Sequence, residues 1–314
     1  MSNSYKYNLI FAGTPEFALP SLKGLIRDDS FNILAVITQP DRKAGRGQKI
    51  TAPPIKKLAQ KNNIPVLQPE KIEKIEKEIS EFRADALVVV SYGQIIPERI
   101  LNLPKHGSFN FHGSLLPRYR GAGVIAAPIL NEDEYTGVTL MKMDAGLDTG
   151  PIIKQNKIKL DKEETLKTLH DKLSQKGAEI LVTALKEYLE GKIKPQPQKE
   201  EEASYAPKLN KQDGKIDWQE NAKIIEKKVR ALNPVPGTHT KLNGKNLKIK
   251  EVEHRFLPIN KFPVGKLFLF KNKLAVQCGQ NALIIKKLQL EGGKEMSAPD
   301  FLKGHPDVEG KILA

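Results

Sequence analysis

The chain has 314 residues, 39% of them hydrophobic, and this length favours two domains because a single core usually stops growing at roughly 250–300 residues. Its 51 Lys and Arg against 37 Asp and Glu give a net charge of +14, which is compatible with a polyanionic partner or with a solvated basic surface. No apolar run approaches the about 18 residues that cross a membrane, and the polar start MSNSYKY lacks a signal-peptide pattern, so we expect a cytoplasmic protein without membrane contact.

The first half of the chain alternates short apolar runs with helical patterns, which is typical of βαβ units. The runs at 7–13, 32–38, 86–91 and 108–112 indicate buried strands of an open, mostly parallel sheet in an α/β fold. Two more strand-like runs, at 137–143 and 151–160, flank the short segment DAGLDTG at 144–150. A long amphipathic helix is then expected within 163–190.

The pattern changes after that helix. Residues 191–207 combine prolines with an acidic run and no periodicity, which predicts a linker between a domain at 1–190 and one at 208–314. The last domain starts with a short helix near 220–231, has an Asn243-Gly244 hairpin signal, and continues with closely spaced strands, the pattern of a small β-barrel. It holds 21 Lys and Arg against 11 Asp and Glu, a balance of +10 against +4 for residues 1–207, so it is the candidate polyanion-binding region. The single cysteine, Cys278, lies in an alternating run and is expected to be a core residue.

Polar side chains share one face of the run at 107–112. Because side chains alternate along a strand, Phe109 and Phe111 lie on one face while Asn110 and His112 lie on the other. Gly113 then ends the run, which places the polar pair near the carboxyl end of a strand, where ligands bind in open α/β sheets. A lone histidine is more often a hydrogen-bonded core residue, but its polar neighbours favour a functional site.

The segment 144–150 carries two carboxylates and two glycines. A polar hairpin turn is the default interpretation of this composition. If the segment instead folds over the end of the sheet, Asp148 can hold His112 in one tautomer. An amide, an imidazole and a carboxylate are then suited to acyl transfer, without a serine or cysteine nucleophile when the attacking group arrives on the substrate.

Two runs, NFHGSLLPRYRG at 110–121 and TGV through MDAGLDTG at 136–150, resemble the formyltetrahydrofolate-dependent formyltransferase family. The resemblance covers nearly the whole chain and implies a Rossmann-like first domain, an OB-like C-terminal barrel, 10-formyltetrahydrofolate as co-substrate and no metal. The catalytic residues that it implies are Asn110, His112 and Asp148. The residues that it places along the folate site are Ser114, Leu115, Leu116 and Pro117.

Motifs outside this core are similar to the members of the family that act on methionyl-tRNA. They are FAGTPEFA at 11–18, TQPDRKAGRG at 38–47 and YAPKL at 205–209. The 38–47 run predicts a mobile basic loop in which Arg42 and Arg46 grip an RNA end, with a solvated surface loop as the alternative. Two places depart from the family pattern: 122–125 reads AGVI where AAPI is common, and Val235 stands where Trp is common.

We therefore expect a monomeric enzyme that moves a formyl group from the folate to the α-amino group of methionine on initiator tRNA. Asn110 and His112 would stabilise the oxyanion, and Asp148 would orient the imidazole and relay a proton. One alternative is formyl transfer to a small amine, or hydrolysis of formyl-folate, neither of which needs a basic C-terminal region. Another is a non-catalytic RNA-binding protein on a degenerate scaffold, against which the intact set of three residues argues.

Overall fold

The computed structural model describes residues 6–44 and 47–314, which fall into two compact units. The first unit takes in the described residues of Met1–Val124, Tyr135–Lys159 and His170–Ala206. The second takes in Ile125–Glu134, Leu160–Leu169 and Pro207–Ala314, so two short segments from before residue 170 group with the C-terminal part. The domain boundaries expected at 190 and 207 stay a prediction. Among the described residues, no helix is both long and apolar enough to cross a membrane.

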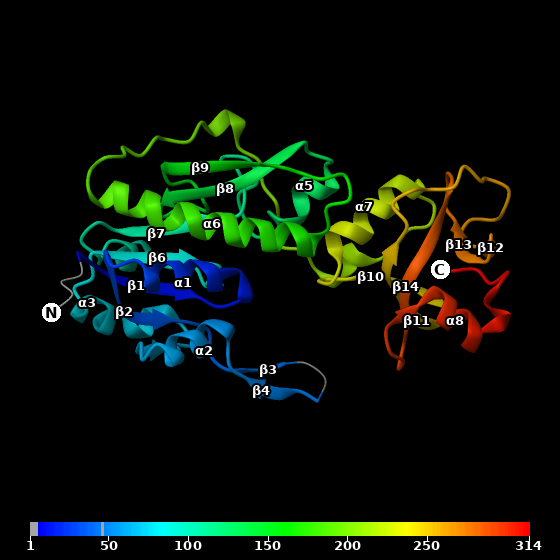
Figure 1. The fold of residues 1–314 in the computed structure, drawn as a ribbon, viewed down its shortest axis with the longest axis horizontal. Coiled ribbons are helices and arrows are strands. Elements are labelled where there is room, and N and C mark those ends of the chain that lie inside the picture. Colours follow the sequence, from blue (N-terminus) through cyan, green and yellow to red (C-terminus); the bar gives the residue numbers. More distant parts are fainter. Residues whose placement is uncertain (1–5, 45–46) are drawn as a thin grey trace. The chain divides into compact units, whose positions relative to one another are not determined.

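The first unit is built on a seven-stranded sheet with the order β5-β2-β1-β6-β7-β8-β9 (Figure 1). The first five strands in this order pair in parallel, whereas β8 and β9 run antiparallel to their neighbours. The open, mostly parallel sheet predicted from the apolar runs is thereby confirmed. The strands are β1 (Tyr7–Gly13), β2 (Phe31–Ile37), β5 (Val66–Leu67), β6 (Ala86–Val90), β7 (Ser108–His112), β8 (Tyr135–Lys142) and β9 (Ile152–Lys159).

The long helix α6 packs against β7, the fifth strand in this order. A Cβ on Gly177 of α6 would lie 1.6 Å from the ring of Phe111, so the helix can approach the strand this closely only with glycine there. The helix ends before Gly191, whose φ of 74° is typical of a helix terminus, as the sequence predicts. The helices of this part are α1 (Leu19–Arg27), α2 (Pro54–Lys61), α3 (Glu76–Glu81), α4 (Glu98–Leu101) and α6 (Leu166–Leu189).

The second unit holds an antiparallel sheet with the order β10-β11-β14-β13-β12, to which β15 adds by pairing with β14. Asn243 and Gly244 have φ of 50° and 76° and join β10 to β11, which confirms the predicted hairpin because a type I′ turn needs two positive φ values. The strands are β10 (Thr238–Leu242), β11 (Lys245–Val252), β12 (Leu267–Phe270), β13 (Lys273–Gln277), β14 (Ala282–Leu290) and β15 (Met296–Ser297). The helices are α5 (Ala126–Leu130), α7 (Ala222–Leu232) and α8 (Ala298–Gly304).

The C-terminal residues join the two edges of this sheet. The backbones of Lys241 and Ala314 exchange two hydrogen bonds, of 2.9 and 3.0 Å, on the β10 side. On the β12 side, Leu313 N donates to Gly265 O at 2.9 Å and Leu267 N donates to Lys311 O at 2.8 Å. The sheet therefore curls back on itself, in the manner of the expected barrel, around a core that contains Cys278. Burial raises the pKa of this thiol to about 12, in keeping with a core residue.

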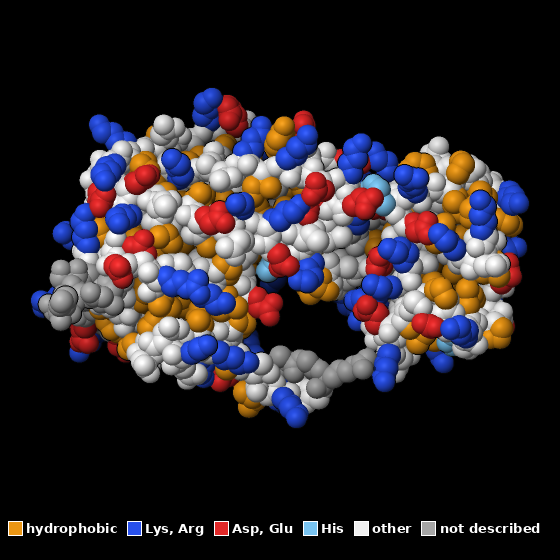
Figure 2. All heavy atoms as spheres, viewed as in Figure 1, with side chains coloured by type: hydrophobic (Ala, Val, Ile, Leu, Met, Phe, Trp, Pro, Cys, Tyr) orange, Lys and Arg blue, Asp and Glu red, His pale blue; other side chains and the backbone are white. Residues whose placement is uncertain are grey.

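The lysines of the second unit are not alike in their surroundings. Figure 2 shows Lys and Arg side chains interspersed with Asp and Glu on the visible face. Several lysines form ion pairs, for example Lys228 with Glu220 at 2.6 Å. The β10–β11 hairpin carries three exposed lysines that form no ion pair within the described part of the chain. These three, called the hairpin lysines below, are Lys241, Lys245 and Lys248.

Candidate active site

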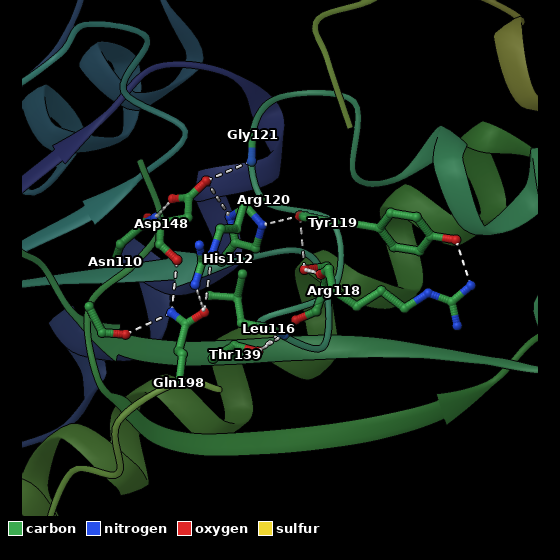
Figure 3. Close-up of polar contacts among 12 residues, drawn as sticks. Asn110, His112, Leu116, Arg118, Tyr119, Arg120, Gly121, Thr139, Asp148 and Gln198 are labelled. Carbon is green, nitrogen blue, oxygen red and sulfur yellow. Dashed lines mark hydrogen bonds and ion pairs between the residues drawn. The ribbon is translucent and has the colours of Figure 1, made fainter. Parts of the chain in front are cut away.

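Strand β7 separates its apolar and polar side chains as the alternation predicts. Phe109 packs edge-on against Tyr188 of α6 with ring centroids 5.2 Å apart, and Phe111 stacks on Phe17 at 5.6 Å. Asn110 and His112 lie on the opposite face, towards the 144–150 segment (Figure 3). The strand therefore uses its aromatic face to anchor the amide and the imidazole.

Asp148 is the point where three separate segments meet (Figure 3). Its Oδ1 accepts a hydrogen bond of 3.3 Å from Asn110 Nδ2, and its Oδ2 accepts one of 2.8 Å from the backbone N–H of Gly121. The same Oδ2 lies 3.7 Å from Nδ1 of His112, a distance for charge attraction rather than for a hydrogen bond. The 144–150 segment thus folds over the end of β7 and is not a plain hairpin turn.

The tautomer of His112 follows from its second contact. Nε2 lies 2.9 Å from the carbonyl oxygen of Tyr119, and a carbonyl oxygen only accepts, so Nε2 carries the hydrogen. Nδ1 is then the nitrogen that faces the Asp148 carboxylate. The His112 side chain is only 7% exposed, so most of the imidazole ring is covered by protein.

The turn at 114–117, to which the resemblance assigns folate contacts, is hydrogen-bonded to side chains of β8 and β9. The hydroxyl of Ser114 donates to the carbonyl of Arg118 at 2.7 Å, and the backbone N–H of Leu116 donates to Thr139 Oγ1 at 3.1 Å. Both Ser114 and Leu116 are buried, whereas Leu115 and Pro117 are half-buried. Ser114 and Leu116 thus hold the turn in shape, while Leu115 and Pro117 are the two of the four that reach the surface in part.

Residues 198–206, called the strap below, lie along the first unit and hold the chain that leads from Tyr119 to Gly123. Arg120 N donates to Ser204 O at 2.8 Å, and Ala206 N donates back to Arg120 O at 2.8 Å. Gly123 N also donates to Ala206 O, at 2.9 Å. The acidic stretch that predicts a linker is therefore hydrogen-bonded to the 119–123 chain, a finding that its sequence pattern does not indicate.

Arg120 is the charged centre of this region, with a side chain that is only 1% exposed. Its Nη1 and Nη2 donate to the two carboxylate oxygens of Glu200 at 2.9 and 2.8 Å, the fork geometry that only a guanidinium provides. Nε and Nη2 also donate to Gln198 Oε1, at 3.3 and 3.1 Å. The hydrogen bonds to Glu200 raise the pKa of Arg120 further above its ordinary value.

The backbone around Asp148 is held in an uncommon conformation. Asp148 has a φ of 55°, in the left-handed region that few residues other than glycine adopt. A Cβ on the nearby Gly150 would lie 1.8 Å from the carbonyl oxygen of Lys142, so this position admits only glycine. Local chain geometry, as well as side-chain contacts, therefore directs the carboxylate towards His112 and Asn110.

The basic loop predicted at 38–47 forms a two-stranded hairpin, with β3 (Arg42–Ala44) paired to β4 (Lys49–Thr51). The hairpin projects away from the main sheet (Figure 1), and Arg42 lies exposed on it. At its base, Asp41 accepts hydrogen bonds from Lys56 at 2.8 Å and from Gln68 at 2.7 Å. Arg42 is thus not part of the Asn110, His112 and Asp148 cluster, and Arg46 lies outside the described residues.

Two contributors to the site were not predicted. Gln198 stands in a segment without periodicity, and Tyr119 contributes only its carbonyl oxygen, which every residue type possesses. One signal did point to this region: Arg120 is one of only 9 arginines among 51 cationic residues, which suggests a geometric need for the guanidinium. The buried fork on Glu200 is such a need.

The sequence matches known families over most of its length. Residues 6–185 match the family model described as formyl transferase, and residues 208–306 match the formyl transferase C-terminal domain. The chain belongs to the formyl transferase family. A protein named methionyl-tRNA formyltransferase from Caldanaerobacter subterraneus is 44% identical over 97% of this chain and 99% of its own length. One of the same name from Geobacter metallireducens is 43% identical over 95% of each chain.

Solved structures share the fold at lower identity. HypX from Aquifex aeolicus, in complex with tetrahydrofolic acid, aligns with a TM-score of 0.68 at 15% identity and covers 98% of this chain and 49% of its own. An N-formyltransferase from Helicobacter canadensis, in complex with folinic acid and dTDP-3-aminofucose, aligns with a TM-score of 0.65 at 22% identity, covering 90% of this chain and 98% of its own. These likenesses confirm the Rossmann-like α/β fold expected for the first part of the chain.

Proposed function

We propose that this protein transfers the formyl group of 10-formyltetrahydrofolate to the α-amino group of methionine on initiator tRNA. The observation that carries the proposal is the meeting of Asn110, His112 and Asp148 at the end of β7, in a chain 44% identical to a protein named methionyl-tRNA formyltransferase. The three side chains come from two segments, since Asn110 and Asp148 are 38 residues apart in sequence, and the backbone N–H of Gly121 donates to Asp148 from a third. The site is thus assembled by the fold as a whole.

The reaction joins the amine nitrogen to the formyl carbon and breaks the bond between that carbon and N10 of the folate. The attacking amine loses one proton, and N10 gains one as it leaves, so the protein must move a proton between two nitrogens of its substrates. Negative charge develops on the formyl oxygen in between, and donors placed towards it lower the barrier. Both needs are of the kind that an amide, an imidazole and a carboxylate meet.

Asn110 is the proposed oxyanion donor. Its side-chain NH₂ carries two hydrogens, of which one is directed to Oδ1 of Asp148 at 3.3 Å. The other remains for the formyl oxygen. The contact with Asp148 also fixes which end of the amide points to the reacting atoms, so the donor is in position before the substrates bind.

His112 and Asp148 are the proposed proton relay. Because Nε2 of His112 is committed to the Tyr119 carbonyl, the atom that takes or gives a proton is Nδ1. Oδ2 of Asp148, 3.7 Å away, stabilises the imidazolium when Nδ1 is protonated. A protonated Nδ1 is also a second donor to the developing oxyanion. The same imidazole therefore stabilises the negative charge and transfers the proton.

Substrate binding is divided between the two parts of the chain in this proposal. Residues 1–190 carry catalysis, with Ser114, Leu115, Leu116 and Pro117 along the folate and with Arg42 and Arg46 on the acceptor end of the tRNA. Residues 208–314 attract the tRNA through their balance of +10, and 191–207 connect the two. We further propose that the enzyme acts as a monomer in the cytoplasm, where charged tRNA is found.

The test is direct incubation with 10-formyltetrahydrofolate and methionyl-tRNA, scored for formyl-methionine after hydrolysis of the ester. Initiator tRNA is expected to be formylated much faster than methionyl elongator tRNA, and release of tetrahydrofolate should match the formyl-methionine formed. Tetrahydrofolate released without acceptor would instead establish hydrolysis. Formylation of an amino sugar nucleotide with no product on tRNA would establish a small-amine enzyme, and tRNA binding without folate turnover a non-catalytic binder.

A further inference from the structure

The orientation of the Gln198 side chain can be read from its partners. Its Oε1 accepts from Nε and Nη2 of Arg120, at 3.3 and 3.1 Å, and a guanidinium only donates. Its Nε2 donates to two backbone carbonyls, those of Asp148 at 2.8 Å and Gly150 at 2.7 Å. The donor and acceptor roles of these partners are compatible with only one orientation of the amide. The Gln198 side chain is therefore fixed between Arg120 and the 148–150 chain (Figure 3).

Arg120 connects the Gln198 amide to the 119–123 chain, which also contacts Asp148. The residue after it, Gly121, donates its backbone N–H to Asp148 Oδ2. A Cβ on Gly121 would lie 2.8 Å from Ala206 O, so the chain here is pressed against the strap. Asp148 is therefore held at two points: Gln198 holds its backbone carbonyl, and the N–H of the residue next to Arg120 holds its carboxylate.

We propose that Gln198 is a positioning residue for the transfer reaction, acting through the backbone of Asp148. Gln198 fixes the position of the 148–150 backbone relative to β7. This position determines the 3.7 Å separation of Asp148 Oδ2 from His112 Nδ1 and the contact of Asp148 with Asn110. The inference rests on the proposed function, because Gln198 bonds to Arg120 and to the 148–150 backbone and matters for the reaction only if Asp148 takes part in it. The strap is then part of the catalytic apparatus as well as a connector.

The residue type fits this role. Only an amide can accept from a buried guanidinium at one end and donate to two carbonyls at the other. In Gln198→Glu, the carboxylate still satisfies Arg120, but it faces the carbonyl oxygens of Asp148 and Gly150 without a proton to donate. The variant keeps the size of the side chain and an acceptor for Arg120. Its main effect is therefore to displace the 148–150 backbone from its position.

The experiment measures kcat and both KM values for Gln198→Glu and Gln198→Ala, with thermal melts of each protein. Misplacing a catalytic group by about 1 Å costs on the order of 100-fold, so we expect kcat to fall about 10- to 100-fold while both KM values stay within about twofold. Gln196→Ala is the matched control, since Gln196 is exposed and pairs with Ile152 through backbone atoms alone. It should behave as the wild type.

A double-mutant cycle separates positioning from a general structural role. If Gln198 acts through Asp148, adding Gln198→Glu to Asp148→Asn should lower kcat no further than Asp148→Asn alone. Three outcomes would each overturn the inference. The losses in kcat could multiply in the double variant, the kcat of Gln198→Glu could stay within about twofold of the wild type, or the loss could be confined to KM. Full activity of Asp148→Asn would instead remove Asp148 from the proposed mechanism, which distinguishes failure of that mechanism from failure of the positioning role.

Discussion

Arg120 and Glu200 share a two-pronged ion pair, although the arginine side chain is 1% exposed and the glutamate side chain is 72% exposed. The glutamate reaches in from the surface and neutralises a charge that lies inside the first unit. Removing the carboxylate therefore leaves a buried guanidinium without its counter-ion, which is more costly than the exposure of Glu200 suggests.

Glu200→Gln is expected to lower the melting temperature at pH 7. The Arg120 hydrogen bond lowers the pKa of Glu200 below its ordinary value of 4.5, so the pair stabilises the fold above that pH and loses its effect as the pH falls through the lowered value. The gap in melting temperature between variant and wild type should thus narrow on going from pH 7 towards strongly acidic pH. Glu201→Gln removes the same charge from the same exposed turn and should show a smaller gap. An equal gap at every pH would mean that the carboxylate charge is irrelevant.

Asn110→Ala and His112→Ala should each lower kcat by about two orders of magnitude or more, because donors to a developing oxyanion are typically worth roughly 2.7–4 kcal/mol. The affinity for tRNA should hardly change, since neither side chain is proposed to contact the tRNA body. Single-turnover rates and filter binding measure the two quantities. Ser108→Ala is the control for damage to β7, because Ser108 lies on the same face of the strand and its hydroxyl donates to Leu101 O. A wild-type kcat in either variant removes that residue from the mechanism.

Arg42→Ala should reduce kcat/KM for charged tRNA about tenfold, which corresponds to about 1.4 kcal/mol, and leave folate binding intact. Arg42 is exposed on a hairpin that projects from the sheet, where a guanidinium is free to meet a phosphate. Lys43→Ala provides the comparison, since neighbouring residues on a strand point to opposite faces. Equal losses in the two variants would indicate a general effect of charge, and a parallel loss of folate affinity would put Arg42 at the folate site.

Replacing the three hairpin lysines by Gln should weaken tRNA binding and flatten its salt dependence. Each phosphate contact contributes roughly 0.7–0.9 to the slope of log affinity against log salt, so loss of all three would lower the slope by about 2 to 3. The same triple change at Lys71, Lys74 and Lys77, which are exposed in the first unit, removes equal charge elsewhere and is the control. If both triple variants retain the wild-type slope, the positive charge of the hairpin is only a solvated surface.

The parts of the site that the sequence predicted are those fixed by local periodicity. The division of β7 into an aromatic and a polar face follows from alternation alone, and Phe109 and Phe111 lie as it requires. The Asn243-Gly244 turn and the end of α6 before Gly191 are equally local. In each case a pattern within a few residues determines the backbone, and no distant contact competes with it.

The strap could not be predicted for the opposite reason. Its bonds join Gln198 and Ser204 to backbone atoms some 50 to 85 residues away, and a carbonyl oxygen leaves no trace in the amino-acid sequence. A stretch with prolines and three successive glutamates has no apolar periodicity, so composition favours a linker. Sequence patterns reveal how a segment buries apolar surface. The strap is held to the first unit by hydrogen bonds instead, which such patterns do not reveal.

The left-handed backbone at Asp148 narrows the residues that evolution or an engineer can place there. Asp and Asn tolerate this conformation better than other residues with a Cβ, because a short polar side chain can bond to its own neighbourhood. Glutamate carries the same charge but lacks that tolerance and is one methylene longer. The identity of this residue is therefore specified twice, once by backbone shape and once by acidity, and aspartate is the single amino acid that satisfies both requirements.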